Sequence, residues 1–145
     1  MPTCRSRAVP VFINFCKTIS METSRKALRP QVATDKEAQH PMEQFQNDVL
    51  RPILKMQNDL ILSIYRHFLH KRKVPFNGMS REKRDQWIRS SMSKDNRLRG
   101  IMLGLVVGQF VEDELDFFLS HESEVRRRIT ELMTQRLQSQ VKTLL

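Results

Sequence analysis

The sequence predicts an all-α fold, a compact bundle of about five helices with a flexible N-terminal extension. Apolar residues beyond Pro41 recur at spacings of three and four, which places them on one face of a helix. Glycine occurs only four times, and the chain is rich in Leu, Met, Gln, Lys, Arg and Glu, which favour helix over sheet. The alternation of apolar and polar residues that indicates a strand does not occur after position 41.

Residues 1–41 are expected to be a disordered extension of a domain that spans residues 42–145. Four of the six prolines fall in this extension, and no helical period runs through it. Its first twenty residues are basic, as in a targeting leader, but Met21 offers a second start for translation, which would make residues 1–20 an artefact. Cys4 and Cys16 lie here and form no CxxC pair, so neither a disulfide framework nor a zinc site is predicted.

A long helix is predicted first, from Val49 to Phe68, because its apolar residues form a wide continuous face. Pro52 lies near the start, so the helix either kinks there or begins close to Val49, after a short lead-in helix at 42–48. Proline, asparagine and glycine then indicate a loop at 71–79.

Shorter helices follow this loop. Ser80 is expected to cap a helix that ends near Met92, Ser93 to cap the next one, and Ser123 to cap the last. A short acidic helix is expected at 111–119. The apolar residues predicted to be buried on these helices are Leu98, Ile101, Met102, Leu105, Val106, Leu115, Phe118, Leu119, Val125, Ile129, Leu132, Met133, Leu137 and Val141.

Glycines at 100, 104 and 108 form a ridge along one of these helices. Glycine costs roughly 1 kcal/mol relative to alanine inside a helix, so three of them require a reason. A ridge without side chains lets another backbone approach closely. Gly100, Gly104 and Gly108 therefore predict close packing on the long helix within the domain, or alternatively the seam of a homodimer. Gly108 is also suited to end the helix.

The net charge of +9 is distributed very unevenly. Eleven basic residues stand against three acidic ones between Arg66 and Arg99, a local charge of +8. Positions 100–125 contain six acidic residues and no Lys or Arg. The basic segment would attract a polyanion, or the acidic segment of a second copy. The remaining alternative is a solvated surface without a partner.

A set of basic residues and one aromatic are the candidates for polyanion binding: Lys71, Arg72, Lys73, Arg81, Lys83, Arg84, Arg89 and Trp87. Trp87, with Phe76 nearby, could stack on bases. Alternatively, Trp87 belongs to the core and the charges are solvated. Because the sequence contains no helix-turn-helix, RNA-binding aromatic motif or zinc finger, nucleic-acid binding would be mainly electrostatic.

No arrangement of residues suited to catalysis is found. His67 and His70 lie three positions apart and could share a metal, but a third ligand is missing. We therefore predict no catalytic residue, metal, cofactor or identifiable small-molecule ligand. The longest apolar stretch, at 101–107, is far shorter than the ~20 residues that cross a bilayer. We expect a cytoplasmic protein without a membrane segment.

Two segments, RPILKMQNDL at 51–60 and GIMLGLVVGQF at 100–110 with the acids after it, resemble a family of short uncharacterised bacterial helical proteins. The resemblance covers roughly residues 43–140. Some members carry a glyoxalase label, which implies a metal-dependent lyase built on βαβββ units with His, Gln and Glu ligands. This chain has no matching ligand set, so no site residue is carried over.

The prediction for function is a non-catalytic interaction protein that binds RNA or a nucleic-acid-containing assembly through its basic segment. The alternatives are a metal-dependent lyase of glyoxalase type and a structural subunit that forms a homodimer through the glycine ridge.

Overall fold

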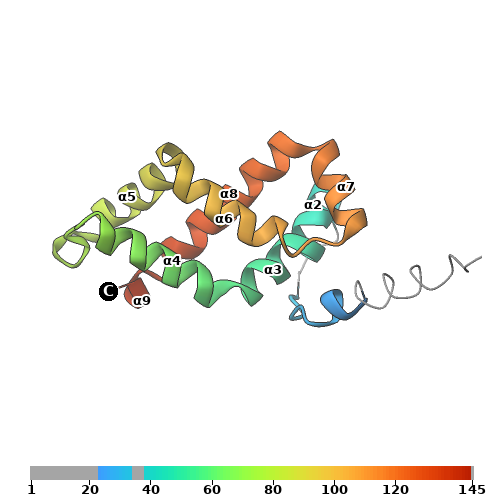
Figure 1. Ribbon diagram of the computed structural model, residues 1–145, viewed down its shortest axis with the longest axis horizontal. Helices are drawn as coiled ribbons and strands as arrows, with labels where there is room; N and C mark the ends of the chain where they lie inside the picture. The colour runs from blue at the N-terminus through green and yellow to red at the C-terminus, as the bar shows by residue number, and fades with distance from the viewer. Residues whose placement is uncertain (1–22, 34–37, 145) are drawn as a thin grey trace, which may run out of the picture.

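Helices make up the secondary structure of residues 23–33 and 38–144, the part of the chain that this computed structural model describes, and no strand occurs in it (Figure 1). The predicted all-α class is therefore confirmed. The expectations for residues 1–20, Cys4 and Cys16 included, lie outside the described residues.

The predicted long helix is divided into shorter pieces. α2 (Pro41–Phe45), a π-helical turn η1 (Gln46–Leu50), α3 (Arg51–Met56) and α4 (Asn58–Lys71) follow one another. In η1 the Arg51 N–H donates to the carbonyl of Gln46, five residues back. Pro52 has no N–H to donate, and in a regular helix its ring would clash with the carbonyl four residues before it. The irregularity expected near Pro52 thus takes the form of a wider turn.

A second break, at Gln57 between α3 and α4, was not predicted. The first residue beyond it, Asn58, is held by the end of the last long helix. Its side-chain oxygen accepts hydrogen bonds from Arg136 Nη1 at 3.1 Å and from Gln140 Nε2 at 3.0 Å. These bonds join residues about eighty positions apart, which is why local spacing contains no sign of them.

The remaining elements are a 3₁₀ turn η2 (Phe76–Gly78), α5 (Arg81–Lys94), α6 (Asn96–Val107), α7 (Glu112–Ser120), α8 (Glu122–Ser139) and α9 (Val141–Leu144). The division of the first helix and the separate α9 give more helices than the five expected.

Of the three predicted caps, only Ser80 is confirmed, since its side chain accepts from the Lys83 N–H. Ser93 lies inside the last turn of α5, and Asp95 caps α6 instead by accepting from Leu98 N–H at 2.9 Å. The prediction for Ser123 is wrong because α8 begins before it.

α8 packs against α5, α6 and α7, and α9 packs against α4. The buried residues of α8 lie at intervals of four, as predicted: Val125, Ile129, Met133 and Leu137. On α6 the buried stripe is Leu98, Met102 and Val106, as predicted. Three predicted core residues are corrected, because Ile101 (47% exposed), Leu115 (37%) and Leu119 (61%) lie on helix faces without a covering neighbour.

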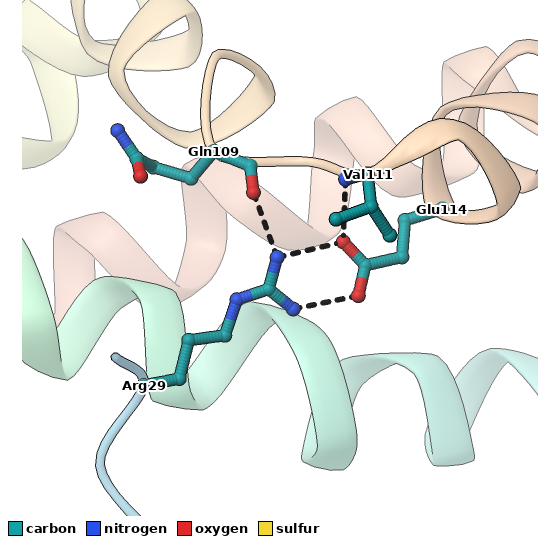
Figure 2. A network of polar contacts seen from close by, with 4 residues as sticks. All are labelled: Arg29, Gln109, Val111 and Glu114. Atoms are coloured by element: carbon teal, nitrogen blue, oxygen red, sulfur yellow. Dashed lines mark hydrogen bonds and ion pairs between the residues drawn. The ribbon is translucent and has the colours of Figure 1, made fainter. Parts of the chain in front are cut away.

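The folded region includes residues before the expected boundary at Pro41. Arg29 binds Glu114, the third residue of α7, through Nη1–Oε1 and Nη2–Oε2 contacts of 2.6 and 2.8 Å (Figure 2). Arg29 also donates to the carbonyl of Gln109 at 2.7 Å, while Glu114 accepts from the Val111 N–H at 3.0 Å. Both charged side chains are buried. Arg29 is thus joined to the α6–α7 connection and is not part of a free extension.

Candidate polyanion-binding surface and the adjoining groove

The turn between α4 and α5 lies at one end of the molecule, and Arg72 and Lys73 follow Lys71, the last residue of α4, into it (Figure 1). α4 ends in a Schellman motif, in which Val74 N–H donates to the carbonyl of Leu69 and Lys73 N–H to that of His70. Lys73 is the C′ residue and has a φ of 51°, the left-handed conformation that favours glycine. A lysine is therefore held in a conformation that is unfavourable for a residue with a side chain.

Arg84 stabilises this turn from α5. Its Nε and Nη2 atoms donate to the carbonyls of Phe76 and Asn77, both at 2.9 Å. Its guanidinium also lies over the Phe76 ring, 5.6 Å from the centroid. Phe76 is buried, so it cannot stack on a base. Arg84 and Phe76 together fix the loop, and neither is free to bind a polyanion.

Arg72 links the turn to the start of α6. It pairs with Asp95 and lies 4.8 Å from the centroid of the Phe68 ring. Asp95 is the cap of α6, and the Leu98 N–H, together with the Arg72 guanidinium, holds the pKa of Asp95 below its usual range. Asp95 is therefore ionised at neutral pH and neutralises Arg72.

The side chains of five predicted binding residues are exposed and form no hydrogen bond or ion pair with any described residue: Lys71, Lys73, Arg81, Lys83 and Arg89. We call these five residues the basic surface. Two acids lie between these residues in the sequence, Glu82 and the partly buried Asp85. Hydrogen bonds from its own backbone N–H and from Ser80 lower the pKa of Glu82, and the charge of Arg81 lowers it further. The basic surface thus keeps a clear excess of positive charge.

Trp87 is only partly exposed. It is half-buried and packs against the core, and its indole Nε1 is buried without a hydrogen-bond partner among the described residues. Phe76 is buried, so the predicted stacking of a base on this ring is wrong. Stacking on the half-buried Trp87 stays a prediction.

A groove of about 390 Å³ adjoins the basic surface between α4 and the start of α6. Its apolar walls are Ile64 and Phe68 from α4, and Leu98 and Ile101 from α6. The other lining residues are His67, Lys71, Arg72, Asp95 and Arg97. The groove therefore combines an apolar interior with a mainly basic rim. The sequence gives no sign of this groove, because its residues come from two helices whose mutual position the spacing does not specify.

A larger hollow, of about 830 Å³, lies between α6, the end of α7 and α8. Its arginines already have partners. Arg126 and Arg127 form ion pairs with Glu122 and Glu131, and Arg99 donates to the carbonyl of Ser93. This hollow therefore has much less unpaired positive charge than the basic surface.

The glycine ridge faces solvent. A Cβ added to Gly100 or Gly104 would meet no atom within 4 Å, so the close approach expected inside the domain does not occur at either position. Gly108 is the C-cap of α6, which confirms the alternative prediction that it ends this helix. The homodimer seam stays a prediction.

Neither a metal nor a membrane is indicated by the described residues. His67 and His70 are exposed, and within residues 23–33 and 38–144 no three His, Cys, Asp or Glu side chains gather as metal ligands would. In the same residues no helix is long and apolar enough to span a bilayer. The helices also differ from the βαβββ units that the glyoxalase label implies.

The chain matches no protein-family model, no curated protein and no solved structure. Interpretation of the site therefore depends on its geometry and charge.

Proposed function

We propose that this protein binds single-stranded RNA by electrostatic contact between the RNA phosphates and the basic surface. The observation that supports the proposal is a set of five exposed cations at the end of α4, in the turn that follows and on α5, whose side chains form no ion pair with any described residue. Most charged groups of a folded protein gain little from isolated surface pairs. A cluster of unpaired cations, in contrast, raises the local concentration of a polyanion and releases its counterions on binding.

The backbone at Lys73 supports the same interpretation. Glycine would adopt a φ of 51° without strain, whereas lysine does so at a cost of about 1 kcal/mol. Residues held in strained conformations are concentrated at functional sites. The positive charge at the end of α4 is thus kept at the expense of stability.

Single-stranded RNA is favoured over a sequence-specific DNA duplex because the sequence contains no helix-turn-helix or zinc-finger motif that would place a helix in the groove of a duplex. The cations of the basic surface come from a turn and from the outer side of α5. They can contact phosphates but do not select a particular base sequence. We expect binding that tolerates changes of sequence and depends strongly on salt.

The experiment is a fluorescence anisotropy titration of a labelled, mixed-sequence single-stranded RNA at several salt concentrations. The test variant carries Lys73→Gln, Arg81→Gln and Lys83→Gln, three exposed positions that make no contact with the core. A matched control carries Lys26→Gln, Lys55→Gln and Lys142→Gln, which remove the same charge from exposed sites elsewhere.

The test variant should bind more weakly than wild type, and its slope of log affinity against log salt should be smaller by about 2, since each phosphate contact contributes about 0.7 for single strands. The control should keep the wild-type slope. Equal slopes for the two triple variants, or an affinity that is independent of salt, would contradict the proposal.

A further inference from the structure

The outer face of α7 has the chemistry opposite to that of the groove between α4 and α6. Leu115 and Leu119 are one helical turn apart and exposed, and Glu112 and Asp116 lie beside them at the same spacing. These four residues form an acidic and apolar ridge, which we call the α7 ridge. Its carboxylates have no ion pair with any described residue.

The α7 ridge is held rigidly in place from the inside. Glu114, on the opposite side of the same helix, is buried and is fixed by Arg29 and by the Val111 N–H (Figure 2). Because α7 is fixed, a partner can bind its outer side chains without the entropic cost of ordering a mobile segment.

The groove matches this ridge in its apolar lining and in its charge. Two apolar pairs line it, Ile64 with Phe68 on α4 and Leu98 with Ile101 on α6, and each pair is spaced to lie on one helix face. Lys71 and Arg97 are exposed at its rim and have no ion pair among the described residues. Leucines of the ridge would enter the apolar interior, while its carboxylates would meet the rim cations.

Within one molecule the two surfaces cannot meet. The groove lies toward the end that holds the α4–α5 turn, and α7 lies toward the opposite end of the long axis (Figure 1). Two complementary surfaces that cannot meet within one molecule can meet between two copies of it.

We infer that the groove between α4 and α6 binds the α7 ridge of a second copy of this chain. The two contacts are reciprocal in a closed dimer, in which each groove holds the partner's α7 ridge. The contact is small and partly electrostatic, so we expect a weak dimer that dissociates as salt rises.

The first test is the molar mass of the nuclease-treated protein, measured by sedimentation equilibrium over a wide range of concentrations at low salt. The mass should rise with concentration from 17.2 kDa toward twice this value. A mass that stays at one chain at all concentrations would overturn the inference.

Variants then identify the interface. Leu115→Gln with Leu119→Gln should raise the dimer dissociation constant by more than about tenfold, because it removes the apolar part of the ridge. Both leucines are exposed, so helix content should not change. The matched control is Leu60→Gln, a 53% exposed leucine of α4 that does not line the groove. An equal effect of the control would refute this assignment.

Charge reversal provides a second, independent check. Lys71→Glu with Arg97→Glu should abolish self-association, as should Glu112→Lys with Asp116→Lys in a separate protein. A mixture of the two proteins should associate again, since the reversed groove now faces a reversed ridge. No recovery in the mixture would rule out this pairing of surfaces.

Different variants test the dimer contact and the binding of RNA, so the result for one does not decide the other. The α7 variants leave the basic surface intact, so they should lose self-association and keep RNA binding. The Lys73, Arg81 and Lys83 triple variant leaves the groove intact, so it should do the reverse.

Discussion

Arg29 and Glu114, separated by 85 positions in the chain, share two hydrogen bonds in a buried ion pair. The pair connects the segment that precedes α2 to the first turn of α7. Because the carboxylate also accepts from the Val111 N–H, one side chain both caps the helix and anchors the N-terminal segment.

Replacement of Arg29 by Met should lower the free energy of unfolding by about 3 kcal/mol, because Glu114 would be left buried without its counter-charge. Replacing both residues, by Arg29→Met and Glu114→Gln, should cost less than the sum of the two single changes. Chemical denaturation of the four proteins in this cycle measures the coupling. Additive costs would show that the pair contributes no interaction energy.

Tyr65, the chain's one tyrosine, should ionise at unusually high pH. Burial raises its pKa to about 12 from the ordinary 10, and its hydroxyl is 2.8 Å from Ser91 Oγ. The pKa is higher in the folded protein than in the unfolded chain, so the protonated hydroxyl of Tyr65 contributes to the free energy of unfolding. This contribution is complete below pH 10 and is lost as the pH rises from 10 to 12. Ultraviolet titration of the phenolate measures this directly. In Tyr65→Phe the loss of stability over this pH range should disappear.

Lys73→Gly should make the protein more stable and weaken its binding to RNA. Glycine adopts the left-handed φ of this position freely, so we expect a gain of about 1 kcal/mol. Lys73→Ala is the control, because it removes the charge but keeps the strain. Both variants should lose the same amount of RNA affinity, while only the glycine variant should be stabilised.

Gly104→Ala should stabilise α6 by roughly 1 kcal/mol, since the new methyl group would lie in open space within a helix. Gly108→Ala should not show this gain, because a Cβ there would lie 3.0 Å from the carbonyl oxygen of Gly104. Thermal denaturation of the two variants compares them. A destabilised Gly104→Ala protein would indicate that the ridge is covered in solution.

Asp95→Asn should increase affinity for RNA. Asparagine is as good a cap as aspartate, so α6 should keep its start, but Arg72 would lose its counter-charge and add to the basic surface. Because the pKa of Asp95 is lower in the folded protein than in the unfolded chain, its charge contributes stability at neutral pH, and this contribution is lost as the pH falls through the folded pKa. The free energies of unfolding of wild type and Asp95→Asn, measured as the pH is lowered, should therefore converge at low pH.

Much of the helical arrangement could be predicted from spacing alone. Val125, Ile129, Met133 and Leu137 were expected in the core and are buried, because α8 has neighbours along its whole apolar stripe. Leu119 was expected there as well, yet it is exposed. Spacing shows that a helix has an apolar face but does not show which part of that face another helix covers.

The candidate site was predictable only in part. A run of basic residues identified the basic surface, but Arg72 and Arg84 are engaged by Asp95 and by two loop carbonyls. Such pairings depend on how α4, α5 and α6 are placed in space. The groove arises from the placement of α4 and α6, and the Arg29–Glu114 pair from the contact of the segment before α2 with α7, so the sequence contained no local signal for either.

The distance in sequence between Arg29 and Glu114 has a consequence for the order in which a ribosome produces the fold. At about 5–20 residues per second, roughly 4–17 seconds separate the synthesis of the two residues. In the later part of this interval the arginine has left the exit tunnel, while its acceptor has not yet been made. The segment around Arg29 therefore stays accessible to chaperones and processing enzymes during translation, and it loses that accessibility once α7 has emerged.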